Sequence, residues 1–253
     1  MHLILTGATG LVGSGVLDAM VKMNEITKIS ILSRRPVKFA EDLKDPRINV
    51  VINKDFENYD PAVLSQLKDA TGCVWALGIS QTQVDKEEYV KITKTMALKA
   101  AEAFQSLPPK NEPFNFVYVS GAGATTTPGR FSAIFARIKG ETELALAEQR
   151  KTNPSFHASS IRPAFVDAAA HQAIKPYLPV PTLSIRALQG GLGPIIRNAM
   201  PSQWSPTEQL GRFLTEVAMG KHKSALVAGP GVQMVGQFPI VENSVFRKLA
   251  GLS

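Results

Sequence analysis

Cysteine and histidine are scarce in this sequence of 253 residues, which contains one cysteine and four histidines. A single thiol cannot form an internal disulfide, and Cys73 lies in the apolar run CVWAL, so we expect a buried, inert side chain in a reducing compartment, the cytoplasm. The histidines show no spacing typical of metal ligands, and we therefore expect no metal site. They are His2, His157, His171 and His222.

Long apolar runs are also missing. The first apolar stretch, HLILTG, is too short for a signal peptide or a membrane span, so we expect no targeting segment and no membrane contact. The formal charge is +7, but the basic groups, such as SRRPVK and KHK, are short and lack interleaved aromatics. We therefore expect no nucleic acid partner. The expected partner is a small-molecule substrate, and a homodimer stays open.

Short apolar stretches alternate with segments of helical periodicity up to about residue 166. Strands are predicted at residues 2–7, 28–33, 48–53, 72–78, 114–120 and 156–166, and helices at 11–23, from 61, at 86–107 and at 130–150. This alternation predicts an α/β fold, a doubly wound parallel sheet with helices on both faces. From residue 167 prolines break the rhythm around one helix at 205–220. We therefore expect a core at residues 1–166 and a small irregular C-terminal cap over the substrate at 167–253, both within a single domain.

A glycine-rich turn, TGATGLVGSG, joins the first predicted strand to the first helix. Three-residue spacing of Gly7, Gly10 and Gly13 allows a tight turn, a close approach of the backbone to a pyrophosphate, and helix–strand packing. The helix N-terminus then offers unpaired N–H groups to the anion. The sequence context of strand, turn and helix makes a dinucleotide site the favoured interpretation. The residues of this part of the site are Thr6, Gly7, Thr9, Gly10, Leu11, Val12 and Gly13.

The second predicted strand ends without a carboxylate. Dinucleotide sites selective for NAD usually have Asp or Glu near this point, which binds the ribose 2′-hydroxyl. This chain instead has Ser33, Arg34 and Arg35. Arginine is the expected partner of a 2′-phosphate, and a carboxylate there would repel it. The sequence therefore predicts NADPH or NADP as the cofactor.

Several further segments resemble the short-chain dehydrogenase/reductase superfamily, a family with a Rossmann fold, and the glycine spacing is that of its extended and atypical branches. They are SRR, KDF, ALG, YVSGAGA, KGETE and IRPAFV, and with the glycine turn they cover residues 1–166. The resemblance implies that Asp55 and Phe56 flank the adenine and that Ala76, Leu77 and Gly78 line the cofactor ribose. It also implies that Pro163, Ala164, Phe165 and Val166 hold the nicotinamide carboxamide.

The same resemblance implies that Ser120 and Lys139 are active-site residues, but the tyrosine expected four residues before the lysine is absent. In the family this tyrosine protonates the substrate oxygen, and the lysine binds the nicotinamide ribose and lowers the tyrosine pKa. Phe135 occupies the position here. A phenyl ring has no proton to donate, so it cannot be the general acid.

Four other polar side chains are candidates to replace the hydroxyl of the missing tyrosine. Tyr118 shares a strand face with Ser120, but we expect it in the core, and we expect His171 to be structural. Arg130, expected to start the helix that carries Phe135, and Asp167, at the end of the sixth strand, are candidate catalytic residues facing the cleft. An ordinary surface ion pair is an equally good interpretation of these two.

Three functions remain open from the sequence. The favoured one is an NADP(H)-dependent reductase whose activated acceptor, for example an iminium, needs no tyrosine acid. The second is a protein that binds NADPH as a sensor or interaction module without turnover. The third is a cofactor-assisted cyclase or isomerase that uses the same cleft. The fold alone does not choose among these three functions.

Overall fold

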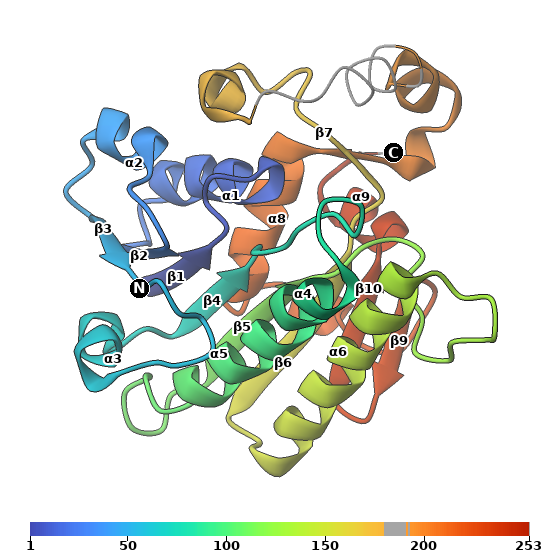
Figure 1. Cartoon of the computed structure of the whole chain (residues 1–253). Helices are drawn as coiled ribbons and strands as arrows, with labels where there is room; N and C mark the ends of the chain where they lie inside the picture. Colours follow the sequence, from blue (N-terminus) through green and yellow to red (C-terminus); the bar gives the residue numbers. More distant parts are fainter. Residues whose placement is uncertain (180–190, 192, 253) are drawn as a thin grey trace.

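The computed structural model describes residues 1–179, 191 and 193–252 of the chain. Within them, an eight-stranded sheet has the order β3-β2-β1-β4-β5-β6-β10-β9, and its strands are parallel except for the antiparallel β9 (Figure 1). Its strands are β1 (His2–Thr6), β2 (Lys28–Ser33), β3 (Ile48–Ile52), β4 (Gly72–Trp75), β5 (Phe114–Val119), β6 (Phe156–Arg162), β9 (Val232–Val235) and β10 (Phe238–Glu242). The predicted doubly wound α/β fold is confirmed.

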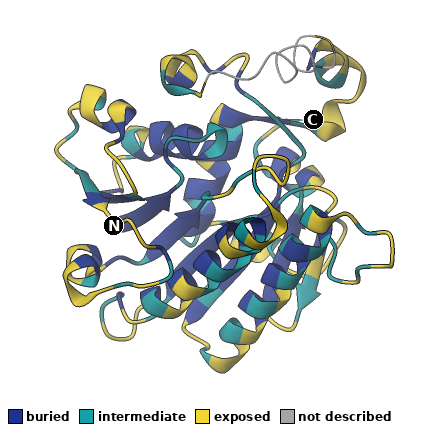
Figure 2. Ribbon diagram, viewed as in Figure 1, coloured by how far each residue is buried: buried dark blue, intermediate teal, exposed yellow. Residues whose placement is uncertain are grey.

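Helices cover both faces of this sheet. One face packs against α1 (Leu11–Lys22), α2 (Lys38–Leu43), α8 (Thr207–Ala218) and α9 (Asn243–Leu249). The other packs against α3 (Pro61–Leu67), α6 (Ile134–Thr152) and a continuous helix of α4 (Lys86–Val90), η1 (Lys91–Thr95) and α5 (Met96–Phe104). Figure 2 shows the helices buried on their inner sides and exposed on their outer sides, as amphipathic patterning requires. Two apolar cores therefore lie on opposite faces of the sheet.

Asp60 and Pro61 begin α3 as the sequence indicates, since the Asp60 carboxylate accepts a hydrogen bond from the Val63 N–H at 2.8 Å. The helix carrying Phe135 differs from the prediction, because α6 begins at Ile134 rather than at residue 130. Residues 124–133 form instead an irregular loop without helix or strand.

The C-terminal region is more regular than its prolines indicate. Helix α8 packs along α1, and β10 continues the parallel sheet beside β6. The more irregular part contains β7 (Phe165–Asp167), which pairs with β8 (Trp204–Pro206), and the short helices η2 (Gln172–Tyr177) and η3 (Pro201–Gln203). Figure 1 shows it above the end of the sheet where β1 and β4 finish. Residues 180–190, 192 and 253 of the predicted cap lie outside the described residues.

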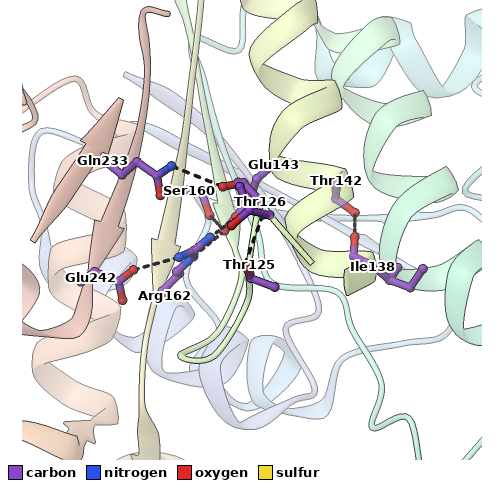
Figure 3. Close-up of polar contacts among 10 residues, drawn as sticks. Thr125, Thr126, Ile138, Thr142, Glu143, Ser160, Arg162, Gln233 and Glu242 are labelled. Carbon is purple, nitrogen blue, oxygen red and sulfur yellow. Dashed lines mark hydrogen bonds and ion pairs between the residues drawn. The ribbon is translucent and has the colours of Figure 1, made fainter. Parts of the chain in front are cut away.

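A buried ion pair joins α6 to the sheet (Figure 3). The Arg162 guanidinium at the end of β6 donates to both oxygens of Glu143 on α6, with Nε–Oε1 at 3.0 Å and Nη2–Oε2 at 2.5 Å. The Ser160 hydroxyl donates to the same carboxylate at 2.8 Å, and Arg162 also reaches Glu242 on β10 at 2.9 Å. Glu143 is fully buried. These contacts fix α6, β6 and β10 relative to one another.

Removal of one partner from this pair is predicted to destabilise the fold. Glu143→Leu leaves the buried Arg162 charge with only the partly exposed Glu242, so we expect a loss of about 3–5 kcal/mol in the free energy of unfolding. Urea unfolding followed by circular dichroism measures it. Glu141→Leu is the control, because Glu141 lies two residues earlier on α6 in a partly exposed pair with Lys94 and should cost about 1 kcal/mol or less. Equal losses in the two variants would contradict this account.

Candidate active site

The glycine turn after β1 is closed by contacts that only glycine allows. Gly7 has a φ of 70°, and a Cβ atom there would lie 2.3 Å from the carbonyl oxygen of Ala76. A Cβ on Gly13 would lie 2.1 Å from the carbonyl oxygen of Gly7. Gly10 begins α1 without a side-chain cap, so the first N–H groups of the helix lack an intramolecular side-chain partner. The turn thus brings an uncapped helix N-terminus to the carboxyl end of the sheet.

A cleft of about 310 Å³ opens beside this turn. Its lining includes the buried Phe56 and the exposed Arg34 and Arg35. No Asp or Glu lines it among the described residues. Ten of the predicted cofactor residues line the cleft: Gly7, Thr9, Gly10, Ser33, Arg34, Arg35, Phe56, Ala76, Leu77 and Gly78.

The other residues predicted for this half of the site lie beside the cleft. Thr6 is buried, and its hydroxyl oxygen accepts the Leu77 N–H at 3.3 Å, which connects β1 to the cleft wall. Leu11 and Val12 pack against the core below the turn. The Asp55 carboxylate accepts hydrogen bonds from the Asn58 side chain and the Glu57 N–H, which hold its pKa below the usual value. Asp55 therefore closes its own turn, and Phe56 supplies the cleft wall.

Ser120 and Lys139 are brought together at the end of β5. The Lys139 ammonium donates to the Ser120 carbonyl oxygen at 2.6 Å and to the Val119 carbonyl oxygen at 3.5 Å. Desolvation lowers the pKa of Lys139 to about 8, although Glu143 one turn later acts in the opposite direction. The buried Ser120 hydroxyl has no hydrogen-bond partner among the described residues. A buried hydroxyl without a partner is costly, so this arrangement favours a ligand that bonds to it.

Phe135 lies one helical turn before Lys139, against the loop that follows β5. Its Cζ atom is 3.4 Å from the position a Cβ would take on Gly123. The Phe135 N–H donates to the side-chain oxygen of Gln81 at 3.0 Å, so the loop after β4 also contacts the start of α6. The ring occupies a packed position without any hydroxyl, which leaves Ser120 and Lys139 as the polar groups assembled at this point.

Arg130 and Asp167 do not form the pair considered from the sequence. Because α6 begins at Ile134, Arg130 lies exposed in the preceding loop rather than at the helix start. Asp167 ends β7, where one carboxylate oxygen lies 3.2 Å from Nε of Arg197 and the other accepts the Ala169 N–H at 2.9 Å. Arg197 belongs to the helical residues 193–199 of the cap. The proline-interrupted sequence gave no signal that this arginine would reach Asp167.

A second hollow, of about 490 Å³, adjoins the end of β5 and β6. Its inner wall contains Gly121, Ala122 and the predicted residues Pro163, Ala164 and Phe165. The Ala122 N–H donates to the Pro163 carbonyl oxygen at 2.8 Å and joins the two loops. Val166 packs against the core instead of lining this hollow.

Three apolar residues of the cap form the outer wall of this hollow and were missed in the sequence: Ile195, Ile196 and Met200. Their spacing of one and then four residues is typical of one face of a helix, but the prolines on either side argued against a helix in this segment. Their side chains make the hollow predominantly apolar.

Tyr118 and His171 are not groups that replace the missing hydroxyl. Tyr118 is buried, and its hydroxyl donates to the Thr93 carbonyl oxygen at 3.2 Å. The ring nitrogens of the buried His171 lie 3.0 Å from the Thr207 hydroxyl and 3.0 Å from the Asp18 carboxylate. The structure confirms that Tyr118 is in the core and that His171 is structural, since it joins η2 to α1 and α8.

Comparison with known proteins finds relatives among biosynthesis-cluster proteins. The chain is 34% identical over 246 residues to leucinostatins biosynthesis cluster protein T of Purpureocillium lilacinum, covering 90% of this chain and 89% of that protein. It is 44% identical over 159 residues to botcinic acid biosynthesis cluster B protein 16 of Botryotinia fuckeliana, covering 62% of this chain and all of that protein. A more distant relative is the mitochondrial protein FMP52 of Meyerozyma guilliermondii, 31% identical over 144 residues, or 56% of this chain and 57% of that protein.

Among solved structures, a short-chain dehydrogenase/reductase from Saccharomyces cerevisiae aligns with a TM-score of 0.65 and 14% identity, covering 96% of this chain and 95% of that one. This likeness supports the fold. No model of a known protein family matches the sequence. Within the described residues, no helix combines the length and apolar character needed to cross a bilayer.

The lowered pKa of the Lys139 ammonium can be tested by an NMR titration. We expect its pKa at about 8, while ordinary lysines titrate near 10.4. Because the ammonium loses its proton as the pH rises through this value, the ¹³Cε resonance should shift between about pH 7 and 9. Lys139→Met should remove that one resonance and so assign it. A spectrum in which every lysine titrates above about pH 9.5 would show that the ammonium is not desolvated.

Proposed function

We propose that this chain is an NADP(H)-dependent reductase of a small, activated acceptor. The chain belongs to the atypical branch of the short-chain dehydrogenase/reductase superfamily. The observation that carries the proposal is the cleft beside the glycine turn. It combines an uncapped helix N-terminus with two exposed arginines, and its described lining residues include no carboxylate. An anion is favoured at the helix end, and a second phosphate is favoured beside the arginines.

The residues present fit a nicotinamide cofactor carrying a 2′-phosphate. The turn at Gly7–Gly10 would hold the pyrophosphate, Arg34 and Arg35 the 2′-phosphate, and Phe56 the adenine. Lys139 would donate to the nicotinamide ribose, because its ammonium has a donor beyond those bonded to Ser120 and Val119. The cofactor would supply hydride at the hollow beside Ser120.

Cofactor preference tests the arginines directly. NADPH should bind at least tenfold more tightly than NADH, because a charge-assisted arginine–phosphate contact contributes about 1.5–3 kcal/mol. Arg34→Ala and Arg35→Ala should each reduce this ratio without weakening NADH binding, as measured by calorimetry at fixed salt. Arg212→Ala, an exposed arginine on α8, is the control that should leave the ratio unchanged. Equal affinities for the two cofactors in the parent protein would refute NADP selectivity.

The absence of a hydroxyl at Phe135 restricts the acceptor. A neutral ketone needs a proton as its oxygen gains charge, and the ring at this position has none to give. Ser120 can donate a hydrogen bond but is a very weak acid, whereas Lys139, with its pKa of about 8, can hold a proton beside Ser120 near neutral pH. An acceptor already activated, such as an iminium or a conjugated carbonyl compound, requires less of these groups. The permanently charged guanidinium of Arg130 cannot donate a proton near neutral pH either.

The hollow indicates the kind of acceptor. Ile195, Ile196, Met200 and Phe165 give it apolar walls, so we infer a substrate with an apolar body. The names of the two nearer relatives place those proteins in biosynthesis clusters, and we propose that this chain likewise reduces an intermediate of small-molecule biosynthesis.

The Asp167–Arg197 pair allows the charge of the acceptor to be determined. Asp167→Asn leaves the positive charge of Arg197 uncompensated and should lower turnover of a cationic iminium by roughly a hundredfold, the effect of losing one electrostatic stabiliser. Arg197→Gln frees the carboxylate and should change turnover in the opposite direction. Turnover of a neutral enone should respond much less to either change. Steady-state kinetics with both acceptors and each variant measure this, and parallel losses in both variants would contradict a cationic acceptor.

Phe135→Tyr tests the missing acid. The change restores a hydroxyl one turn before Lys139, so it should add activity toward simple ketones, measured as NADPH oxidation, while leaving turnover of activated acceptors within about threefold. If the parent protein already prefers neutral ketones, the proposed acceptor class is wrong. If NADPH binds and is not oxidised with any iminium, enone or ketone, the protein is better described as an NADPH-binding sensor or interaction module.

We also propose the cytoplasm as the compartment. The buried Cys73 thiol fits a reducing environment, and burial raises its pKa well above the usual value, which makes it unreactive. The likeness to a mitochondrial protein provides the competing location. Fluorescence microscopy of the chain tagged at its C-terminus distinguishes the two.

A further inference from the structure

A further pocket, of about 370 Å³, lies at the opposite end of the sheet from the proposed cofactor cleft. Asn115 and His157 line it near the amino ends of β5 and β6, and Gly220 lines it just after α8. The cofactor cleft is at the carboxyl ends of β1, β2 and β4. Because these strands are parallel, the two sites lie at opposite ends of the strands.

Arg150 gives this pocket an uncompensated positive charge. The residue lies near the end of α6, and its Nη1 donates to the Ala158 carbonyl oxygen. This carbonyl is accessible to Arg150 because β10 pairs with β6 only from Ser160 to Arg162. Within the described residues Nε of Arg150 is buried without a partner, and burial without a neighbouring carboxylate lowers the pKa of the guanidinium. A guanidinium carries five N–H donors, and Nη1 alone has a hydrogen bond among the described residues.

The surroundings of Arg150 strengthen the positive potential. Lys223 also lines the pocket, and no Asp or Glu is among the described lining residues. The pKa of His157 is lowered, first by burial and then by the charges of Arg150 and Lys223. The site is therefore polarised for an anion, and a desolvated arginine without a counter-charge gains stability when an anion binds.

Apolar side chains form one part of the pocket wall, beside polar residues that include Ser159 and Gln237. Val217, Leu226, Met234 and Pro239 lie around it, and Val227 is 56% exposed at its edge. A bare inorganic ion would leave this wall in water, whereas an apolar chain attached to the anionic group would cover it. The volume lies within the range of pockets for small molecules.

We propose that this pocket binds a small organic carboxylate, with its carboxylate on Arg150 and Lys223 and a short apolar chain along Val217, Leu226 and Met234. Arginine binds carboxylates with two parallel hydrogen bonds, which orients such a ligand. The site is independent of the proposed reductase activity and of the cofactor cleft.

Calorimetry with hexanoate as the probe tests the proposal, with the protein alone and again with NADPH added, because hexanoate affinity at this pocket should be the same in both. Hexanoate should bind with a dissociation constant of roughly 1 mM or tighter, a range that about eight non-hydrogen atoms can reach. Hexan-1-ol lacks the charge and acetate lacks the chain, so each should bind at least tenfold more weakly. Inorganic phosphate should also bind at least tenfold more weakly, and equal binding of phosphate and hexanoate would overturn the role of the apolar wall.

Matched variants locate the site. Arg150→Gln should weaken hexanoate binding at least tenfold, whereas Lys151→Gln, next to it and exposed on α6, should not. Val227→Asp is a second variant at an exposed position, which places a carboxylate at the pocket edge without disturbing the core, and it should also weaken binding at least tenfold. Unchanged hexanoate affinity in Val227→Asp, or in a folded Arg150→Gln, would overturn the proposal, as would the absence of hexanoate binding to the parent protein.

Discussion

The buried pair of Glu143 and Arg162 holds together the elements on which the candidate active site depends. Glu143 lies on α6 one turn after Lys139 and two turns after Phe135, so its contact with Arg162 of β6 sets where both residues lie. Arg162 is followed directly by Pro163, Ala164 and Phe165, which line the apolar hollow. Because an unpaired buried charge is so unfavourable, this contact holds α6 in one position relative to β6.

Much of the architecture was predictable from sequence because its signals are local. Alternation of short apolar stretches with helical periodicity predicted the six strands from β1 to β6. The glycine spacing and the basic end of β2 predicted six residues that line one cleft, and the family resemblance added Phe56, Ala76, Leu77 and Gly78. Gly7 and Gly13 have roles that backbone geometry alone dictates, so they could be inferred without any knowledge of tertiary contacts.

The parts that escaped prediction depend on contacts between distant segments. The hairpin of β9 and β10 was indicated only by a Gly236–Gln237 turn between two short apolar runs, at the end of a proline-rich region. Arg197 and Asp167 are thirty residues apart, and nothing in the local sequence of either identifies the other. Ser205 reads as a helix cap followed three residues later by Glu208. In the structure it accepts the Ala164 N–H and donates to Asn243, while Pro206 precedes the helix.

Lys139 and Phe135 lie on successive turns of one helix and differ in their effect on the free energy of folding. A desolvated ammonium with a lowered pKa is a free-energy cost to the folded protein below about pH 8, and an apolar side chain of similar length would remove that cost. The phenyl ring at Phe135 carries no such cost. The hydrogen bonds from the Lys139 ammonium to the Ser120 and Val119 carbonyl oxygens therefore offset only part of its desolvation, so the fold holds a charge at the end of β5 that an apolar residue would not place there.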